Sequence, residues 1–263
     1  MKCEQLKDKP TELETFVTEY LSDFTNFAVS YSNLVKEIET KTIYQKPFQF
    51  LEFTATLYPL LVRLYMQNKL DKLLNLLEAI EVRVYKLKGT NPIAGIYWLS
   101  SEITKRDVSV EDISNNLINF NENFMNNHNL KNYLGANVYQ NGAVKYILSE
   151  YSNDNQNLDS YRDWQVEHIF SSDPNFEPTS YGFAEDYDYE KNRLGNLGVL
   201  EAGINKGIGN SAPINKVDGY LKSRVSDTRN LGGEIQQGNF TKDNVDKRRE
   251  RIIEFCITRF AVN

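Results

Sequence analysis

Only two histidines occur in this 263-residue sequence, and one of them lies among side chains that could carry out chemistry together. His168 directly follows Glu167 in the run WQVEHIF, and Asn205 stands 37 residues further on in INKGIGN. A neutral imidazole takes a proton from water near pH 7, whereas Glu and Asn oxygens suit a hard cation such as Mg²⁺. Imidazole, carboxylate and carboxamide are together the parts that single-metal hydrolysis of a phosphodiester needs. The other histidine, His128 in NNHN, is expected at a surface or a helix end.

The charge of the chain changes sharply along its length. Residues 1–149 hold 16 Lys and Arg against 17 Asp and Glu, residues 150–190 hold 1 against 11, and residues 191–263 hold 13 against 8. The overall net charge of −6 argues on average against nucleic-acid binding, which needs cations for phosphates. An acidic stretch followed by a basic one is what a metal site beside a phosphate-contacting surface would have. A solvated acidic loop beside an amphipathic helix explains the same pattern.

The first part of the chain must supply a helical scaffold. Apolar residues recur at helical spacing from residue 11 to about residue 89, and Thr11 with Glu14 has the pattern of a capping box at a helix start. Further helices are predicted over 47–66, where Pro59 should kink or split the helix, and near 92–101, 110–124 and 142–151. The aromatic and leucine stripe of 48–65 is the normal way in which a bundle fills its core, so we interpret it as core rather than a ligand groove.

The residue composition and the predicted secondary structure change after residue 152. The polar segment 152–163 is predicted to be a hinge, followed by a short strand at 164–170, a long acidic loop at 171–192 and a second strand or turn at 194–201. A helix is expected from residue 204, interrupted by Gly207, Gly209 and Pro213, and a last helix from 244 to 260. We therefore predict a mainly α protein with two domains, 1–152 and 153–263.

Cysteine content and hydropathy narrow the class of protein. Cys3 and Cys256 lie at opposite ends of the sequence, so a CxxC zinc site or a disulfide framework is not expected. No apolar run reaches the roughly 18 residues that a membrane span needs, and the start MKCEQLKDKP is not a signal peptide. We expect a soluble, cytoplasmic protein that does not contact a membrane.

Four segments in order carry a resemblance to a known family: VEHIF, RLGNLGVLE, INKGIGN and NKVDGYLKS. They resemble the HNH-type nuclease domain at the C-terminal end of GmrSD-type modification-dependent restriction enzymes and related phage-defence proteins. The resemblance covers about residues 130–263. It departs from the family where Pro174 comes later after the strand than in many relatives, and where Glu167 replaces the Asp of many HNH enzymes.

The resemblance implies a fold and a mechanism. The second domain would be a small α+β ββα-metal (HNH) fold, with His168 as the general base that activates water. Glu167 and Asn205 would hold Mg²⁺ or Mn²⁺, and Asn196 would be a catalytic-site residue that holds the loop between the strands. The function implied is a metal-dependent DNA endonuclease or nickase that acts in defence against phage or foreign, possibly modified, DNA.

Further residues follow from the same resemblance. Lys206, Lys216 and Arg193 are candidates for contacts with DNA phosphates, and Tyr220 and Ser223 are candidate supports. Each lysine could equally be solvated surface. The acidic run from residue 185 to residue 190 could add an outer ligand, but we interpret it as a solvated loop.

Partners and alternatives complete the sequence-based picture. Relatives usually carry an N-terminal ParB-like nucleotide-hydrolysing domain, which this sequence lacks, so we expect either a fragment or a separate nuclease subunit. An apolar patch should then bind such a domain or a second copy. The alternative function is a nucleic-acid-binding or regulatory module with a decayed site that docks the ParB-like partner. A third is an RNA-cutting toxin on the same scaffold, since no residue here reports a 2′-hydroxyl.

Overall fold

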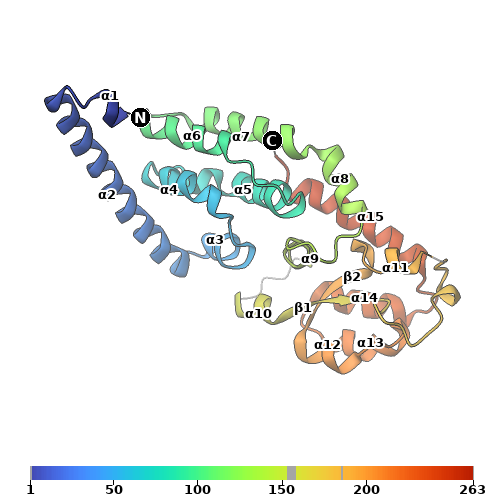
Figure 1. Ribbon diagram of the computed structural model, residues 1–263. Helices are drawn as coiled ribbons and strands as arrows, with labels where there is room; N and C mark the ends of the chain where they lie inside the picture. Colours follow the sequence, from blue (N-terminus) through green and yellow to red (C-terminus); the bar gives the residue numbers. More distant parts are fainter. Residues whose placement is uncertain (1, 153–157, 185, 263) are drawn as a thin grey trace.

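The computed structural model describes residues 2–152, 158–184 and 186–262, and it is mainly helical with one two-stranded sheet, as predicted (Figure 1). Among the described residues, no helix is long and apolar enough to cross a membrane. The helices of the first part, of which η1 and η3 are π-helices and η2 is a 3-10 helix, are α1 (Lys2–Gln5), α2 (Pro10–Thr40), α3 (Thr42–Gln45), η1 (Lys46–Leu51), η2 (Ala55–Leu57), α4 (Tyr58–Met66), α5 (Leu70–Ile80), η3 (Glu81–Leu87), α6 (Ala94–Lys105), α7 (Val110–Met125), α8 (Asn127–Gly135) and α9 (Val144–Tyr151).

The second part contains the sheet and the helices around it. Its elements, with η4 and η5 as 3-10 helices, are α10 (Leu158–Asp163), β1 (Trp164–His168), η4 (Pro178–Tyr181), α11 (Tyr187–Glu190), η5 (Leu194–Asn196), β2 (Leu197–Glu201), α12 (Ala202–Ile208), α13 (Pro213–Lys222), α14 (Ser226–Gln236) and α15 (Lys242–Arg259). Both strands lie within the two predicted segments, although the first ends at His168 and residues 194–196 of the second form η5. The expected interruption at Gly209 and Pro213 separates α12 from α13.

Two prolines lie in the first turn of a helix, although the sequence predicted that Pro59 would kink or split one. Pro59 lies in the first turn of α4, so it begins that helix, and the break falls at residues 52–54 instead. Pro10 is likewise the first residue of α2, and its N-cap Lys9 makes no side-chain hydrogen bond, so the predicted capping box of Thr11 and Glu14 was wrong. Proline fits a first turn because the missing N–H is one that has no partner inside the helix.

The apolar stripe of residues 48–65 is core, as interpreted. Phe48, Leu57, Leu60, Leu61 and Leu64 are all buried in the largest apolar cluster of the protein. Among the described helices of eight residues or more, α8 and α14 were missed, because their sequences are rich in Asn, Gly and charged residues and show little apolar periodicity. Of the predicted hinge, residues 158–163 form α10, and residues 153–157 lie outside the described part of the chain.

The sheet has two faces that look toward different cores. β1 pairs antiparallel with β2, with Val166 opposite Val199 and His168 opposite Leu197. Residues directly opposite each other share a face, so His168 lies on the face of Val166, Leu197 and Val199, which pack against the helical part. Glu167 therefore lies on the other face, toward α12 and α13.

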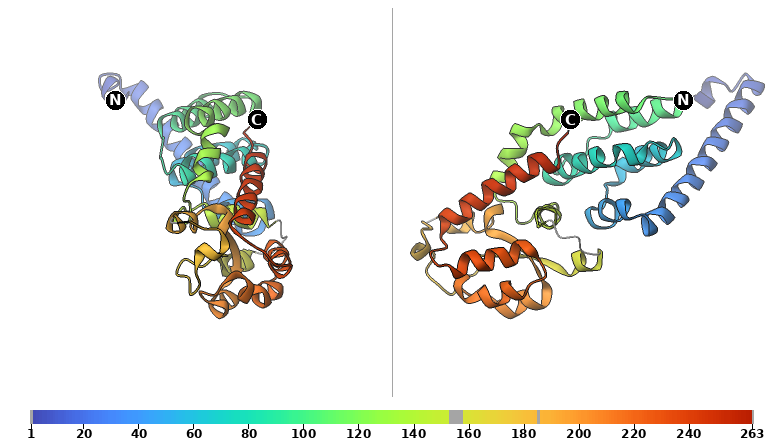
Figure 2. Two further views of the ribbon diagram at one scale, coloured as in Figure 1. Left: turned by 90° about the vertical axis from the view of Figure 1, so that its right-hand side faces the viewer. Right: turned by 180° about the vertical axis from the view of Figure 1, so that it is seen from behind.

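Helix α15 joins the two parts of the protein. It runs from the sheet region back along α8 and α9, as all three views show (Figures 1 and 2). Its Val245 belongs to the smaller core around Phe170, whereas Ile252, Cys256 and Phe260 belong to the larger core of the helical part. The larger core also includes Trp164 and Leu197 of the strands, so apolar packing continues across residue 152. The division into two domains at that residue remains a prediction.

The packing of η5 on α15 leads to a testable prediction. A Cβ built on Gly195 would overlap the Val245 carbonyl oxygen and lie 2.8 Å from Cβ of Arg249, whereas a Cβ on Gly198 meets nothing within 4 Å. We expect Gly195→Ala to lower the free energy of unfolding by about 2 kcal/mol or more, because backbone on both sides must shift. Urea unfolding measures this, with Gly198→Ala as the matched control. Equal stability of the two variants would contradict the close packing.

Candidate functional site

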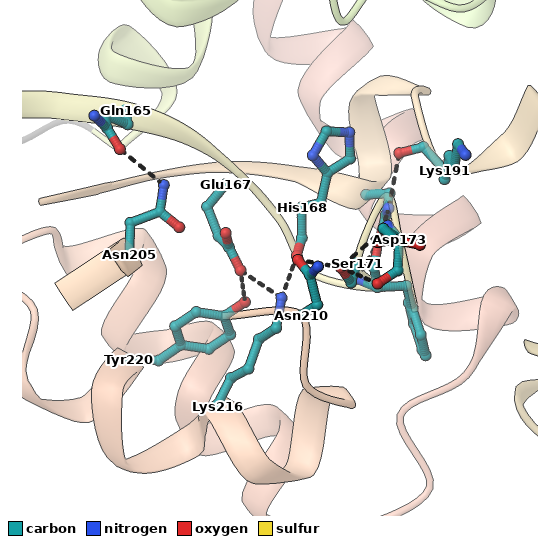
Figure 3. Close-up of polar contacts among 12 residues, drawn as sticks. Gln165, Glu167, His168, Ser171, Asp173, Lys191, Asn205, Asn210, Lys216 and Tyr220 are labelled. Atoms are coloured by element: carbon teal, nitrogen blue, oxygen red, sulfur yellow. Dashed lines mark hydrogen bonds and ion pairs between the residues drawn. The ribbon is translucent and has the colours of Figure 1, made fainter. Parts of the chain in front are cut away.

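The candidate site is built around the end of β1, where the predicted acid–base residues lie. Glu167 and His168 point to opposite faces of the strand, as Figure 3 shows. His168 turns toward α8 and α9, and Glu167 turns toward α13. The structure therefore does not gather Glu167, His168 and Asn205 around one point, although each lies on or next to the hairpin.

The contacts and the burial of His168 favour one tautomer and the neutral ring. Its Nε2 lies 3.0 Å from Oδ1 of Asn192, and the Tyr139 ring packs on it with 4.3 Å between ring centroids. A carboxamide oxygen only accepts, so Nε2 carries the proton and Nδ1 keeps the lone pair. The side chain is only 7% exposed, and this burial lowers the pKa of His168 below its ordinary value of 6.5, against the opposing hydrogen bond to Asn192. The ring can thus accept a proton at neutral pH.

Glu167 is held in a buried polar cluster with two partners from α13. Its Oε1 accepts from Nζ of Lys216 at 2.7 Å and from the Tyr220 hydroxyl at 2.9 Å. Burial raises the pKa of Glu167, while the Lys216 ammonium and these hydrogen bonds act in the opposite direction. Lys216 is 1% exposed and also donates to the His168 carbonyl oxygen at 2.6 Å. The Lys216 ammonium therefore joins the Glu167 side chain to the backbone of the candidate base.

Asn196 fixes the backbone just beyond the histidine. Its Oδ1 accepts from the Phe170 N–H at 2.8 Å, and its Nδ2 donates to the carbonyls of Phe170 and Lys191, each at 2.8 Å. The Ile169 N–H donates to the Asn196 carbonyl at 2.9 Å. These are side-chain to backbone contacts of the kind that the resemblance implied, and the buried side chain has all its hydrogen-bonding groups engaged.

Asn205 lies on the Glu167 side of the sheet, near its far end. Its Nδ2 donates to Oε1 of Gln165 at 3.1 Å, two residues before Glu167 on the same face. Lys206 follows it and is exposed to solvent. Arg193 is engaged by the fold, since its Nε donates to the Gly135 carbonyl at 2.9 Å and its guanidinium pairs with Glu190. Ser223 donates to Glu201 at 2.7 Å and closes the end of α13.

These residues do not fit a cation site as they stand. Among the described residues, no group of three or more His, Cys, Asp or Glu side chains could hold a metal ion. The carboxylate that the resemblance assigns to the metal already accepts from the Lys216 ammonium through its Oε1. In the acidic loop, Asp188 pairs with Lys191, and Glu190 with Arg193 and Lys242, while residue 185 lies outside the described part.

Sequence reasoning missed three residues near the site. Two of them contact His168, and the third contacts Ser171 in the loop after β1. Asn192 lies four residues before Asn196 and gave no signal beyond its amide type. Tyr139 comes from the loop between α8 and α9, far from His168 in sequence. Asn210 accepts from the Ser171 hydroxyl at 3.0 Å. It lies in the run INKGIGN, so it is the missed residue that a sequence pattern could have indicated.

Comparison with known proteins identifies the segment around this site. Residues 119–255 match the family of GmrSD restriction endonucleases, C-terminal domain. No curated protein and no solved structure gives a significant match. The family match confirms the resemblance carried by the four segments, and it begins earlier than they do, inside α7.

The Glu167 and Lys216 pair makes a prediction about stability. Lys216→Met leaves a buried carboxylate without its cation, and we expect a loss of about 3 to 5 kcal/mol in the free energy of unfolding. Glu167→Gln combined with Lys216→Met should recover part of that loss, because the charge that lacked a partner is gone. A double-mutant cycle by urea unfolding measures the coupling. Additive single effects would show that the two side chains are not paired in solution.

Proposed function

We propose, from the premise that this chain belongs to the GmrSD restriction endonuclease family through its C-terminal domain, that it hydrolyses DNA phosphodiester bonds in defence against foreign DNA. The observation that supports this most directly is the state of His168 within the matched segment. A neutral ring at the end of β1 has its protonated nitrogen held by Asn192, so Nδ1 is the atom that would take a proton from water. No residue in the described part donates a hydrogen bond to Nδ1.

The other residues of the site act on the position of that ring. Lys216 holds the His168 carbonyl, and Asn196 holds the two residues after it, so the main chain on the C-terminal side of the base is fixed. A base fixed in this way loses little freedom when substrate binds, which is the usual basis of positioning in catalysis. We assign Glu167, Lys216, Tyr220 and Asn196 as positioning residues in this proposal.

DNA contacts would come from exposed cations of α12 and of the C-terminal end of α13. Lys206 of α12 is exposed, as are Lys222 and Arg224 at the end of α13. Lys216 is buried in the cluster with Glu167, and Arg193 is paired with Glu190, so neither presents its charge to a phosphate in this arrangement. Of the three phosphate contacts predicted from the sequence, we therefore keep Lys206. Lys222 and Arg224 replace Lys216 and Arg193 in this proposal.

A requirement for Mg²⁺ or Mn²⁺, together with the ββα-metal fold, remains a proposal that rests on the resemblance. The arrangement of Glu167 gives it no support, because the Lys216 ammonium already neutralises this carboxylate through Oε1. We derive no step through a metal ion. Asn205 and Gln165 offer carboxamide oxygens on the same face, and these are ligands that Mg²⁺ accepts only weakly without a carboxylate.

The ion pair between Glu167 and Lys216 favours a second candidate function. A buried Glu167 that is already neutralised by Lys216 is what a site that has lost its cation would look like. In that case the domain would bind nucleic acid and regulate a partner without cutting. A third candidate is cleavage of RNA instead of DNA. Incubation with each polymer under the same conditions distinguishes the two substrates.

A partner surface is exposed on the helical part. Along α2 the positions Val17, Phe24, Tyr31 and Ile38 alternate with Tyr20, Phe27 and Leu34, so apolar residues repeat every three and four residues. We name this row the α2 seam. Its C-terminal half packs on the body, where Leu34 and Ile38 are buried, whereas Tyr20 and Phe24 are each 60% exposed where the helix extends away from the body (Figure 1).

Charge indicates what covers the free half of the α2 seam. Residues 10–35 contain four acidic residues and no Lys or Arg, which disfavours pairing of two copies of this helix. In the covered half, α4 supplies apolar residues together with Arg63, which donates to Asp23 and lies over the Phe27 ring. We propose that the partner, the ParB-like domain in the leading case, presents a helix with an apolar stripe flanked by Lys or Arg.

Substitution of the candidate base tests the enzymatic proposal. We expect His168→Ala to reduce plasmid nicking about 10² to 10⁴-fold in buffer with Mg²⁺ or Mn²⁺, because the general base is lost while folding is retained. His128→Ala is the matched control, since this second histidine is exposed on α8 and bonds only to Asn132 within the described chain. Nicking is followed by agarose gel, with EDTA as the metal-free condition and RNA as a parallel substrate.

The outcomes of this experiment separate the candidates. Nicking that survives His168→Ala would remove the histidine mechanism. A wild-type chain that binds DNA without cutting it in either metal would favour the regulatory module. Cutting of RNA alone would favour the toxin.

The partner proposal is tested on the α2 seam. We expect the double variant Tyr20→Glu/Phe24→Glu to weaken binding of a separately produced ParB-like domain at least tenfold by isothermal titration, since two charges would enter an apolar contact. Val29→Glu is the control, because Val29 is 55% exposed but lies off the seam on the same helix. Equal affinity for both variants would place the contact elsewhere.

A further inference from the structure

A cavity of about 620 Å³ lies next to the candidate base, on the side of the sheet toward the helical part. It is lined by residues of the α8 to α9 connection, including Tyr133, Asn137, Gln140 and Asn141, and by Asn192. Asn192 is the residue whose side chain binds His168 at 3.0 Å, so one wall of the cavity is in direct contact with the imidazole. The volume falls within the range of roughly 300 to 1,000 Å³ that is usual for ligand sites.

The lining determines which class of ligand the cavity suits. All of its lining residues are uncharged, so it offers neither the cations that bind a phosphate nor the carboxylates that bind a metal ion. What it offers is four carboxamides and an aromatic ring. Carboxamides donate and accept at the same time, as the edges of nucleobases do, and Asn and Gln bind such edges with two hydrogen bonds.

The carboxamides divide into two that serve the fold and two that are available. Asn141 donates to the carbonyls of Lys86 and Leu87, each at 3.0 Å, and Asn192 is engaged with His168. Asn137 and Gln140 are exposed, and their side chains make no hydrogen bond to any residue in the described part of the chain. The Tyr133 ring is 42% exposed beside them and offers a surface for stacking.

We propose that this cavity binds a nucleobase that has left the base stack and belongs to the nucleotide whose phosphate faces His168. The inference rests on the proposed nuclease function and specifies its substrate: a single strand, or a duplex from which one base is turned outward. Tyr133 stacks on the base, and Gln140 with Asn137 contacts its edge. Turning a base outward rotates it about the backbone, so its phosphate can stay at the histidine while the base occupies the cavity.

Photocrosslinking tests the inference without requiring cleavage. The probe is a single-stranded DNA oligonucleotide with 5-iodouracil at one position, bound to the full chain in EDTA and irradiated, with the crosslinked peptide identified by mass spectrometry. We expect the crosslink on Tyr133. Gln140→Ala should lower the yield about fivefold, which corresponds to loss of one edge contact at the lower end of its usual energy.

A matched control and two outcomes decide the result. Gln236→Ala removes an equally exposed glutamine from α14 and should leave the yield unchanged. Crosslinks that fall only outside the cavity, or a yield that is unaffected by Gln140→Ala, would overturn the inference. A Tyr133 crosslink in a chain that nicks nothing would uphold base capture and reject hydrolysis, whereas nicking without this crosslink would do the reverse.

Discussion

The contact on which the site depends is the buried ammonium of Lys216, which binds the Glu167 carboxylate and the His168 carbonyl at once. Without it, α13 would present a hydroxyl to a buried carboxylate and nothing to the strand backbone. Because one cation satisfies both a side chain and a main-chain oxygen, the helix and the strand have a single compatible register. The orientation of the imidazole, on the opposite face, follows from that register, since neighbouring residues of a strand alternate.

The elements were largely predictable because their signals are local. The strands at residues 164–168 and 197–201 and the helices α6, α7 and α9 all follow from apolar periodicity or β-branched content. The roles of Pro10 and Pro59 depended on which residue begins a helix, and that is decided by the packing of neighbouring segments. Helix α8 packs on the distant α15, and α14 packs on the preceding helix α13, so their own sequences indicate little.

The site was predictable in its residue types but not in its geometry. The run VEHIF indicated His168 and Glu167, and strand alternation already implied that they face apart. Lys216 was expected on the surface, because sequence alone cannot reveal that a lysine has a buried carboxylate as partner. Tyr139 and Asn192 reach the histidine only through the packing of the helical part against the sheet, a tertiary contact with no sequence signature.

Helix α15 places residues in both apolar cores, Val245 in one and Ile252, Cys256 and Phe260 in the other. A helix that packs in both cores couples their unfolding, because loss of packing in one core displaces the helix from the other. The two parts of the protein should therefore melt in one cooperative transition, and slowly exchanging amides should be found along this helix. Binding at the distant α2 helix could then alter hydrogen exchange at the sheet without any contact between them.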